Sequence, residues 1–256
     1  MNQSLKVSTF QMNIEWENRE VNWNTILNTT KSLETDILVL PEMFLSGFSA
    51  EPERVAIKVD DVIFNELKEM SSRLDAAICG SLAIDVRGVY VNRMYFIHPD
   101  GSVNYYDKKH LFRMAGEDKK YSAGDTKAIV EFRGFKFCLQ VCYDLRFPVW
   151  SRNSSDLTTM YDCLIYVANW PKIRSDAWIS LLKARAIENW CYCIGVNRVG
   201  SDGNGLEYDG KSAVFDFKGV KLDDHKENLA SIETTIISKK EIDSYRVAFP
   251  AYLDAE

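Results

Sequence analysis

Residues 135–148 read Phe-Lys-Phe-Cys-Leu-Gln-Val-Cys-Tyr-Asp-Leu-Arg-Phe-Pro and change character half-way along. Apolar residues alternate over the first half, up to Val141, as in a buried β-strand. The second half turns polar at Cys142 and ends at Pro148. A turn directly after a core strand exposes the sulfur and directs the next backbone N–H groups to the same point, which suits a nucleophile. The alternative is that Cys142 is one more buried core cysteine.

Composition narrows the classes of partner. The chain has 256 residues and a net charge of −6, which argues against nucleic acid and weakly against anionic membrane surfaces. The first six residues lack the apolar region of a secretory signal, and no apolar run is long enough to span a bilayer. The six cysteines lie mostly in apolar segments, so we expect a reducing, cytoplasmic location and no disulfide framework.

Apolar periodicity predicts strands that alternate with helices early in the chain and dominate later. Strands are expected at 6–12, 36–40, 76–84, 91–98, 102–106, 132–141, 163–168, 192–199, 212–217 and 230–237. Helices are expected at 21–33, 61–74 and 175–189, with a last short helix after the capping-box signature at 238–241. Residues 112–126 are expected to form a surface loop and 249–256 an extension. This order indicates an α/β layered domain with mixed sheets.

Three ionisable residues each follow the end of an expected strand: Glu42, Lys109 and Cys142. In open α/β sheets, ligands collect outside the carboxyl ends of the strands. Together the three side chains supply one chemistry. A thiolate attacks a carbonyl and forms a thioester, and a carboxylate moves the protons. The lysine ammonium and the Tyr143 backbone N–H stabilise the oxyanion.

Each of these residues also has a plainer interpretation. Glu42 after Pro41 fits a surface-turn carboxylate, and Lys109 fits a solvated charge cluster with the lysine before it. His110 is the tempting base for a Cys–His pair. On an extended segment, however, it points to the face opposite Lys109, which predicts a structural histidine.

Other candidates for a Cys–His pair or a metal site are weak. His98 falls at an expected hairpin turn and His225 in a polar loop. The cysteine pairs lack the Cys-x-x-Cys spacing of zinc sites and of thiol oxidoreductases, so we expect no metal. Cys138, Cys191 and Cys193 are therefore expected to be core residues.

The chain resembles the nitrilase, or carbon–nitrogen hydrolase, superfamily. Three segments in order carry the resemblance: Leu38-Val-Leu-Pro-Glu42, Tyr106-Asp-Lys-Lys109-His-Leu-Phe and Gln140-Val-Cys142-Tyr-Asp-Leu-Arg146-Phe-Pro. The opening strand with Gln11, Val167-Ala-Asn-Trp-Pro171 and Ala184-Arg-Ala-Ile-Glu-Asn189 also fit. The resemblance implies a four-layer α-β-β-α sandwich. It also implies one domain over residues 1–256, with a C-terminal extension from about 246, and subunits that pair as a homodimer.

The resemblance implies a triad of Glu42, Lys109 and Cys142, assisted by Glu117, with no cofactor. Within the superfamily the chain is most similar to the omega-amidase branch. The evidence is the segment from Cys142 to Pro148, the Arg113-Met-Ala loop, Ala168-Asn-Trp-Pro and the compact length. That branch hydrolyses the terminal amide of 2-oxo dicarboxylic acid monoamides, such as 2-oxoglutaramate, and releases ammonia.

A small acidic substrate needs a cationic group to hold it. Arg146 is the candidate because a guanidinium binds a carboxylate bidentately, and the alternative is a structural salt bridge. Tyr143 and Trp170 are expected to complete the substrate site. The competing functions are another carbon–nitrogen hydrolase, acting on a carbamoyl-amine or a nitrile, and a catalytically silent binding protein. Phe249, Tyr252 and Leu253 are expected to be exposed at a subunit interface.

Overall fold

The computed structural model describes residues 4–254. Its strands are β1 (Ser4–Gln11), β2 (Ile37–Val39), β3 (Ile57–Lys58), β4 (Ala77–Val86), β5 (Val89–Ile97), β6 (Val103–Asp107), β7 (Ile129–Phe132), β8 (Phe135–Val141), β9 (Cys163–Ala168), β10 (Tyr192–Asn197), β11 (Val199–Ser201), β12 (Glu207–Asp209), β13 (Ala213–Phe215) and β14 (Ser231–Ser238). Its helices are α1 (Arg19–Thr29), α2 (Pro52–Val55), α3 (Ile63–Leu74), α4 (Pro148–Ser151), α5 (Ser175–Glu188) and α6 (Lys239–Ala248). The expected strands and helices are all present, with ends shifted by a few residues.

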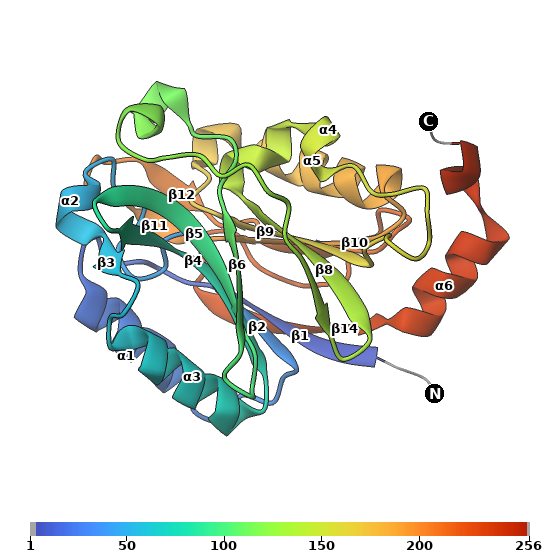
Figure 1. Cartoon of the computed structure of the whole chain (residues 1–256), viewed down its shortest axis with the longest axis horizontal. Helices are drawn as coiled ribbons and strands as arrows, with labels where there is room; N and C mark the ends of the chain where they lie inside the picture. Colours follow the sequence, from blue (N-terminus) through green and yellow to red (C-terminus); the bar gives the residue numbers. More distant parts are fainter. Residues whose placement is uncertain (1–3, 255–256) are drawn as a thin grey trace.

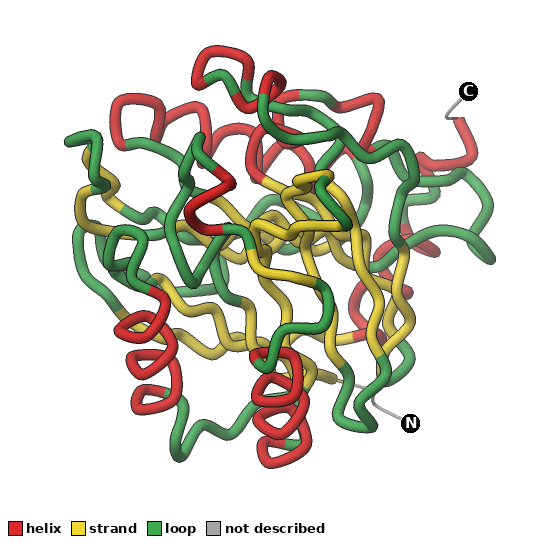
Figure 2. Tube along the Cα trace, turned by 60° about the vertical axis from the view of Figure 1, so that its left-hand side comes forward, coloured by secondary structure: helices red, strands yellow, loops and turns green. Residues whose placement is uncertain are grey.

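Two sheets lie face to face, and helices cover their outer faces (Figures 1 and 2). The first sheet has the order β14-β1-β2-β4-β5-β6, with β3 paired to β4, and the second has the order β13-β10-β9-β8-β7. Helices α1 and α3 pack on the first sheet, and α5 packs on the second. These layers confirm the α-β-β-α sandwich.

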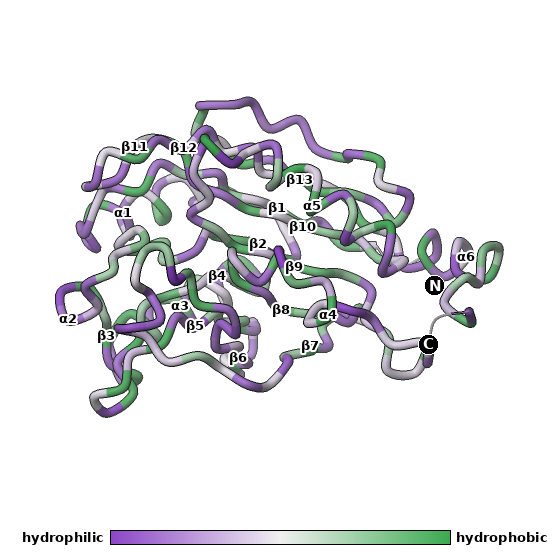
Figure 3. Tube along the Cα trace, turned by 90° about the horizontal axis from the view of Figure 1, so that it is seen from above, coloured by the Kyte–Doolittle hydropathy of each residue, from purple (hydrophilic) through white to green (hydrophobic). Residues whose placement is uncertain are grey.

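The alternation of side chains along each strand divides the core between the layers. In β2, Ile37 and Val39 face the second sheet, whereas Leu38 faces the cluster that includes the apolar residues of α1 and α3. All three are fully buried, as expected of a continuous apolar strand covered on both faces. Figure 3 shows the apolar stretches gathered along central strands such as β8 and β9.

Several local predictions can be compared with the structure. The strand expected at 132–141 begins later, as β8 at Phe135, because Arg133 and Gly134 adopt φ values of 45° and 79° and form the turn that joins β8 to β7. The Ser238 N-cap is confirmed, since its side chain accepts a hydrogen bond from the Glu241 N–H at 3.3 Å, but the reciprocal bond of a capping box is replaced by one from the Ser238 N–H to the Tyr192 hydroxyl at 3.1 Å. The expected surface loop at 112–126 is wrong for Glu117, which is fully buried in the 3₁₀ turn η2 (Glu117–Lys119).

The C-terminal segment stands beside the sandwich (Figure 1). Phe249 and Leu253 are exposed by 54% and 68%, as expected, but Tyr252 is buried. Its ring packs against Trp190 at a centroid distance of 6.2 Å, which explains why the prediction of an exposed Tyr252 is wrong. The last two residues of the expected extension lie outside the described range.

Strand directions bring the chemistry to one end of the molecule. β2 and β4 are parallel, and β6 runs in the same direction because it is antiparallel to β5, which is antiparallel to β4. In the second sheet β8, β9 and β10 are parallel. The residues that follow β2 and β6 therefore lie at the same end of the first sheet, beyond the carboxyl ends of these strands. The residues that follow β8 and β9 likewise lie together at one end of the second sheet. In the folded chain, hydrogen bonds connect these two ends through Asn169 and Glu42.

Candidate active site

Cys142 directly follows β8 and opens the 3₁₀ turn η3 (Cys142–Arg146). Its φ is +46°, a left-handed conformation that is uncommon for a residue with a side chain. The side chain is partly accessible, in contrast to the other five cysteines, which are buried. The strand-to-turn presentation expected of a nucleophile is therefore present, and the alternative of a fully buried core cysteine is wrong.

The lysine that reaches this point is Lys108, and the prediction of Lys109 is wrong. The Lys108 Nζ lies 2.9 Å from Glu42 Oε1 and 2.9 Å from both carboxylate oxygens of Glu117. The Lys109 side chain instead leaves the site, with its Nζ 5.3 Å from the centre of the Trp150 ring. Consecutive residues at a strand end point to opposite faces, and Tyr106 and Lys108 share the buried face.

Glu42 is fully buried, so its interpretation as a surface-turn carboxylate is wrong. Its Oε1 accepts hydrogen bonds from Lys108 and from the Asn92 amide at 2.8 Å, and its Oε2 accepts the Asn169 backbone N–H at 2.8 Å. These donors leave the carboxylate one orientation. Glu42 lies in the turn that follows β2, and Gly80 on the neighbouring strand β4 leaves room for this turn, because a Cβ at position 80 would lie 2.8 Å from the Phe44 side chain.

Glu117 lies among the same groups, as the resemblance implied. Both of its oxygens contact Lys108, and its Oε2 also accepts the Phe112 backbone N–H at 2.6 Å. One ammonium thus lies between two buried carboxylates. The loop that carries Glu117 is held to the site by these bonds.

Burial and charge set the protonation of these groups. Burial alone lowers the pKa of Lys108, but the attraction of Glu117 and Glu42 outweighs it and holds that pKa well above its usual value. Burial raises the pKa of Glu117, and Lys108 offsets only part of this effect. Burial, together with the charge of Glu42, also raises the pKa of the Cys142 thiol well above its usual value. The resting sulfur is therefore a neutral thiol that needs a base before it can attack.

Asp144 ties the nucleophile turn to the lysine segment. Its carboxylate accepts the backbone N–H of Val141 at 3.0 Å, the Tyr106 hydroxyl at 2.9 Å and the backbone N–H of His110 at 2.9 Å. The His110 ring nitrogen lies 2.7 Å from the same carboxylate, and the ring stacks on Phe147 at 3.9 Å. His110 is thus held by structural partners and does not line the cavity at Cys142, which agrees with the structural role predicted for it.

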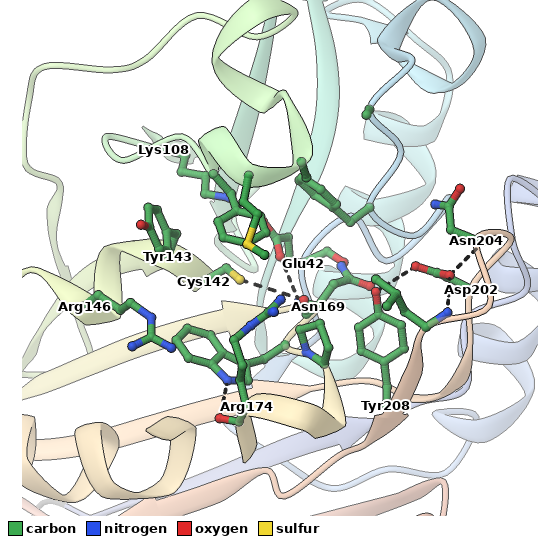
Figure 4. Close-up of a pocket in the computed structure, with 18 residues that line it drawn as sticks. Glu42, Lys108, Cys142, Tyr143, Arg146, Asn169, Arg174, Asp202, Asn204 and Tyr208 are labelled. Atoms are coloured by element: carbon green, nitrogen blue, oxygen red, sulfur yellow. Dashed lines mark hydrogen bonds and ion pairs between the residues drawn. The ribbon is translucent and has the colours of Figure 1, made fainter. Parts of the chain in front are cut away.

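A cavity of about 430 Å³ opens onto Cys142. This volume falls in the range of small-molecule sites, roughly 300–1,000 Å³. Figure 4 shows Glu42, Lys108 and Cys142 close together among the residues that line it. Tyr143, Arg146 and Trp170, the expected substrate residues, all line the cavity. Arg146 is exposed, and its guanidinium carbon lies 4.9 Å from the Trp170 ring centre. Within residues 4–254 Arg146 forms no salt bridge, so the alternative of a structural salt bridge is wrong.

Sequence reasoning missed three residues of the site. Asn92 binds Glu42 from the middle of β5, where no strand end marks it. Asn169 follows β9, so its position after a strand was the available signal. Arg174 lines the cavity from the turn before α5, and no periodicity identifies it. Within the described residues, no group of three or more His, Cys, Asp or Glu side chains could hold a metal ion, and no helix is long and apolar enough to span a membrane.

The sequence pattern of the Carbon-nitrogen hydrolase family matches residues 6–247. The chain belongs to this family. The match covers nearly all of the sandwich and includes every residue of the site described above. The resemblance to the carbon–nitrogen hydrolase superfamily is therefore confirmed.

Proteins similar to this carbon–nitrogen hydrolase include two amidases and one protein of known structure. Omega-amidase YafV of Escherichia coli K12 is 43% identical over 256 residues, covering 98% of this chain and 97% of the relative. The 2-oxoglutaramate amidase of Bacillus subtilis strain 168 is 34% identical over 189 residues, covering 73% and 72%. A solved CN-hydrolase superfamily protein of Xanthomonas campestris, with an arsenic adduct in its active site, is 39% identical, with a TM-score of 0.93 and coverage of 99% and 97%.

Proposed function

We propose that this chain is an omega-amidase, which hydrolyses the terminal amide of small 2-oxo dicarboxylic acid monoamides, such as 2-oxoglutaramate, to the acid and ammonia. The observation that carries the proposal is a partly accessible thiol that lines a cavity together with a buried ammonium held between two carboxylates. Two relatives named for this activity, an omega-amidase and a 2-oxoglutaramate amidase, support the substrate class.

The first half-reaction forms a thioester on Cys142. Glu42 takes the proton of the thiol, which is neutral at rest, and the sulfur attacks the amide carbon. The carbonyl π electrons move onto the oxygen as the C–S bond forms. Lys108 and the Tyr143 backbone N–H stabilise this oxyanion. Lys108 is suited to the role because its raised pKa keeps it charged.

When the oxyanion collapses, the C–N bond breaks and the proton held by Glu42 goes to the nitrogen, so that ammonia leaves and the thioester is complete. The second half-reaction frees the acid. Glu42 then takes a proton from water, and the hydroxide attacks the thioester. The C–S bond breaks and the sulfur recovers its proton. Glu117 assists throughout by holding Lys108 in place with two contacts of 2.9 Å.

The other end of the substrate carries a carboxylate. We place Arg146 and Trp170 in the substrate site, because both line the cavity and the Arg146 guanidinium lies against the Trp170 ring. A guanidinium binds carboxylate through a planar pair of donors.

An ammonia-release screen tests the function. We expect 2-oxoglutaramate to be hydrolysed much faster than ureas and nitriles of similar size, and Cys142→Ala to abolish turnover. Cys142→Ala should also keep the wild-type circular dichroism, since thiol to methyl is a small change. Preference for a nitrile or a carbamoyl-amine would refute the omega-amidase assignment, and an active Cys142→Ala would refute the nucleophile.

We also propose a homodimer and a cytoplasmic location. The exposed apolar residues Val247, Phe249 and Leu253 suit an interface between two copies. All six cysteines are free thiols, which suits a reducing compartment. Light scattering should give twice the chain mass for the wild type and less for Phe249→Ser/Leu253→Ser, and a monomeric wild type would contradict the pairing.

A further inference from the structure

A second arginine lines the active-site cavity. Arg174 ends the 3₁₀ turn η4 (Lys172–Arg174), which follows β9 and precedes α5. Its guanidinium carbon lies 5.3 Å from the ring centre of Phe112, which comes from the segment after β6. The Phe112 ring in turn contacts the ring of Tyr143 at 5.0 Å, beside the nucleophile. Arg174 therefore reaches from the second sheet across the cavity, and Figure 4 shows its side chain directed toward Cys142 and Asn169.

The backbone of Arg174 is fixed. Its N–H donates to the Pro171 carbonyl at 2.9 Å, and its own carbonyl accepts the Trp170 indole N–H at 2.8 Å. The next residue, Ser175, begins α5 and donates to Asp209 at 2.5 Å. A binding group on such a base keeps its position better than one on a mobile loop.

The charge of Arg174 is not neutralised by the protein. Within residues 4–254 neither Arg174 nor Arg146 forms a salt bridge. The nearby carboxylate of Asp202 already accepts the N–H groups of Asn204 and Leu206 and the Tyr208 hydroxyl. The ammonium of Lys108, the remaining cationic group of the cavity, is already paired with Glu42 and with Glu117 behind it. The cavity thus presents two free guanidinium groups to its contents.

Burial distinguishes the two arginines. Arg174 is half-buried and reaches across the cavity toward Phe112, whereas Arg146 is exposed, with its guanidinium carbon 4.9 Å from the Trp170 ring centre. An ion pair is stronger where water is excluded, so the same carboxylate gains more from Arg174 than from Arg146. The contact with Phe112 also holds the guanidinium plane in place without using up its hydrogen-bond donors.

We propose that Arg174 is the principal specificity-determining residue of the site and binds the substrate carboxylate directly, with Arg146 as a weaker second cation. This inference rests on the proposed amidase function and names the group that selects acidic amides. The amide end of the substrate then lies at Cys142 and the anionic end at Arg174. An anionic amide is therefore held at both ends and a neutral amide only at Cys142, so removal of the guanidinium acts on anionic substrates and much less on neutral ones.

The test compares Arg174→Met, Arg146→Met and Lys172→Met. Lys172 is the matched control, because it lies in the same turn but pairs with Glu207 at 3.1 Å and does not line the cavity. Ammonia release is measured with 2-oxoglutaramate, glutaramate and the neutral butyramide. We expect Arg174→Met to lower kcat/KM for both anionic amides by about 30-fold or more. The loss for butyramide should be several-fold smaller, the loss from Arg146→Met should be intermediate, and Lys172→Met should match the wild type.

A second measurement separates this inference from the proposed function. Calorimetry of glutarate binding to the Cys142→Ala protein, with and without Arg174→Met, requires no turnover. A weakening of about 30-fold supports the inference even if 2-oxoglutaramate is not a substrate, in which case only the proposed function fails. Equal losses on anionic and neutral amides, or unchanged glutarate binding, would overturn the role of Arg174. Arg174→Lys, which keeps the charge, should recover part of the anionic activity and guards against misfolding of Arg174→Met.

Discussion

Replacement of Lys108 by Met removes the ammonium that lies between Glu42 and Glu117. Each of its carboxylate contacts is 2.9 Å, and at an effective dielectric constant of 20 one such pair attracts by about 6 kcal/mol before desolvation is subtracted. Breaking a buried pair by deleting one partner typically costs about 3–5 kcal/mol. For a chain of this size, we expect the melting temperature of Lys108→Met to fall by about 6–20 °C.

The same change should lower kcat by about 100- to 1,000-fold, the usual effect of removing one group that stabilises an oxyanion. Lys109→Met is the control, since Lys109 contacts the Trp150 ring and not the carboxylates, and we expect it to retain activity within about threefold. Calorimetric melts and the ammonia assay measure both effects. An inactive Lys109→Met beside an active, stable Lys108→Met would refute the reasoning.

The pH dependence of Lys108→Met gives a further check. Burial already raises the pKa of Glu117, and loss of the ammonium raises it further. A carboxyl whose pKa is higher in the folded than in the unfolded state binds a proton on folding as the pH falls toward its usual value near 4.3, which stabilises the fold. The stability deficit of Lys108→Met should therefore shrink between pH 8 and pH 5. A deficit that grows over this range would contradict the assignment of two uncompensated carboxylates.

Iodoacetamide should modify Cys142 first, because the other five cysteines are at most 1% exposed. The reaction should become faster at higher pH because the pKa of the Cys142 thiol is raised. Equal labelling of all six cysteines, measured by mass spectrometry, would contradict this. Glu42→Gln should lose several orders of magnitude in kcat while His110→Asn keeps substantial activity, and the reverse ranking would restore a Cys–His mechanism. Burial lowers the pKa of His225 to about 4 in the folded chain. Below pH 6.5 this imidazole therefore binds a proton in the unfolded chain but stays neutral in the folded chain until the pH approaches 4. Urea unfolding should therefore show a loss of about 2 kcal/mol between pH 6.5 and 5 that His225→Gln lacks, and equal pH profiles would disprove the linkage.

The sequence predicts the fold well where one signal dominates. The strand expected at 163–168 is β9, with the same ends, because a continuous apolar run flanked by polar residues has one stable arrangement between two layers. Helix α3 begins where Asp61 accepts the Ile63 N–H and ends at Asp75, whose φ is +47°. Both ends follow from local capping chemistry.

The site is less predictable because it depends on register and on long-range contacts. Lys108 and Lys109 are adjacent and chemically identical, and they differ only in the direction of their side chains. Lys108 lies two positions after the buried Tyr106 and therefore points inward with it, whereas Lys109 points to the other face. Glu117 lies in an irregular segment whose polarity suggests solvent, yet Lys108 and the Phe112 N–H pair with it and make its burial possible. Arg174 acquires its role from Phe112, 62 positions earlier in the chain, which no local pattern encodes.

At Cys142 the left-handed backbone conformation favours a residue without a side chain, whereas the chemistry requires a thiol. A residue with a side chain is disfavoured by roughly 1–2 kcal/mol at a φ of +46°, whereas glycine adopts this conformation freely. The backbone conformation therefore favours glycine at this position, whereas turnover requires the thiol. A laboratory selection for heat resistance alone would tolerate glycine at position 142 and erase the enzyme while preserving its architecture. Thermostable variants of this chain should accordingly be recovered under a screen that also demands ammonia release.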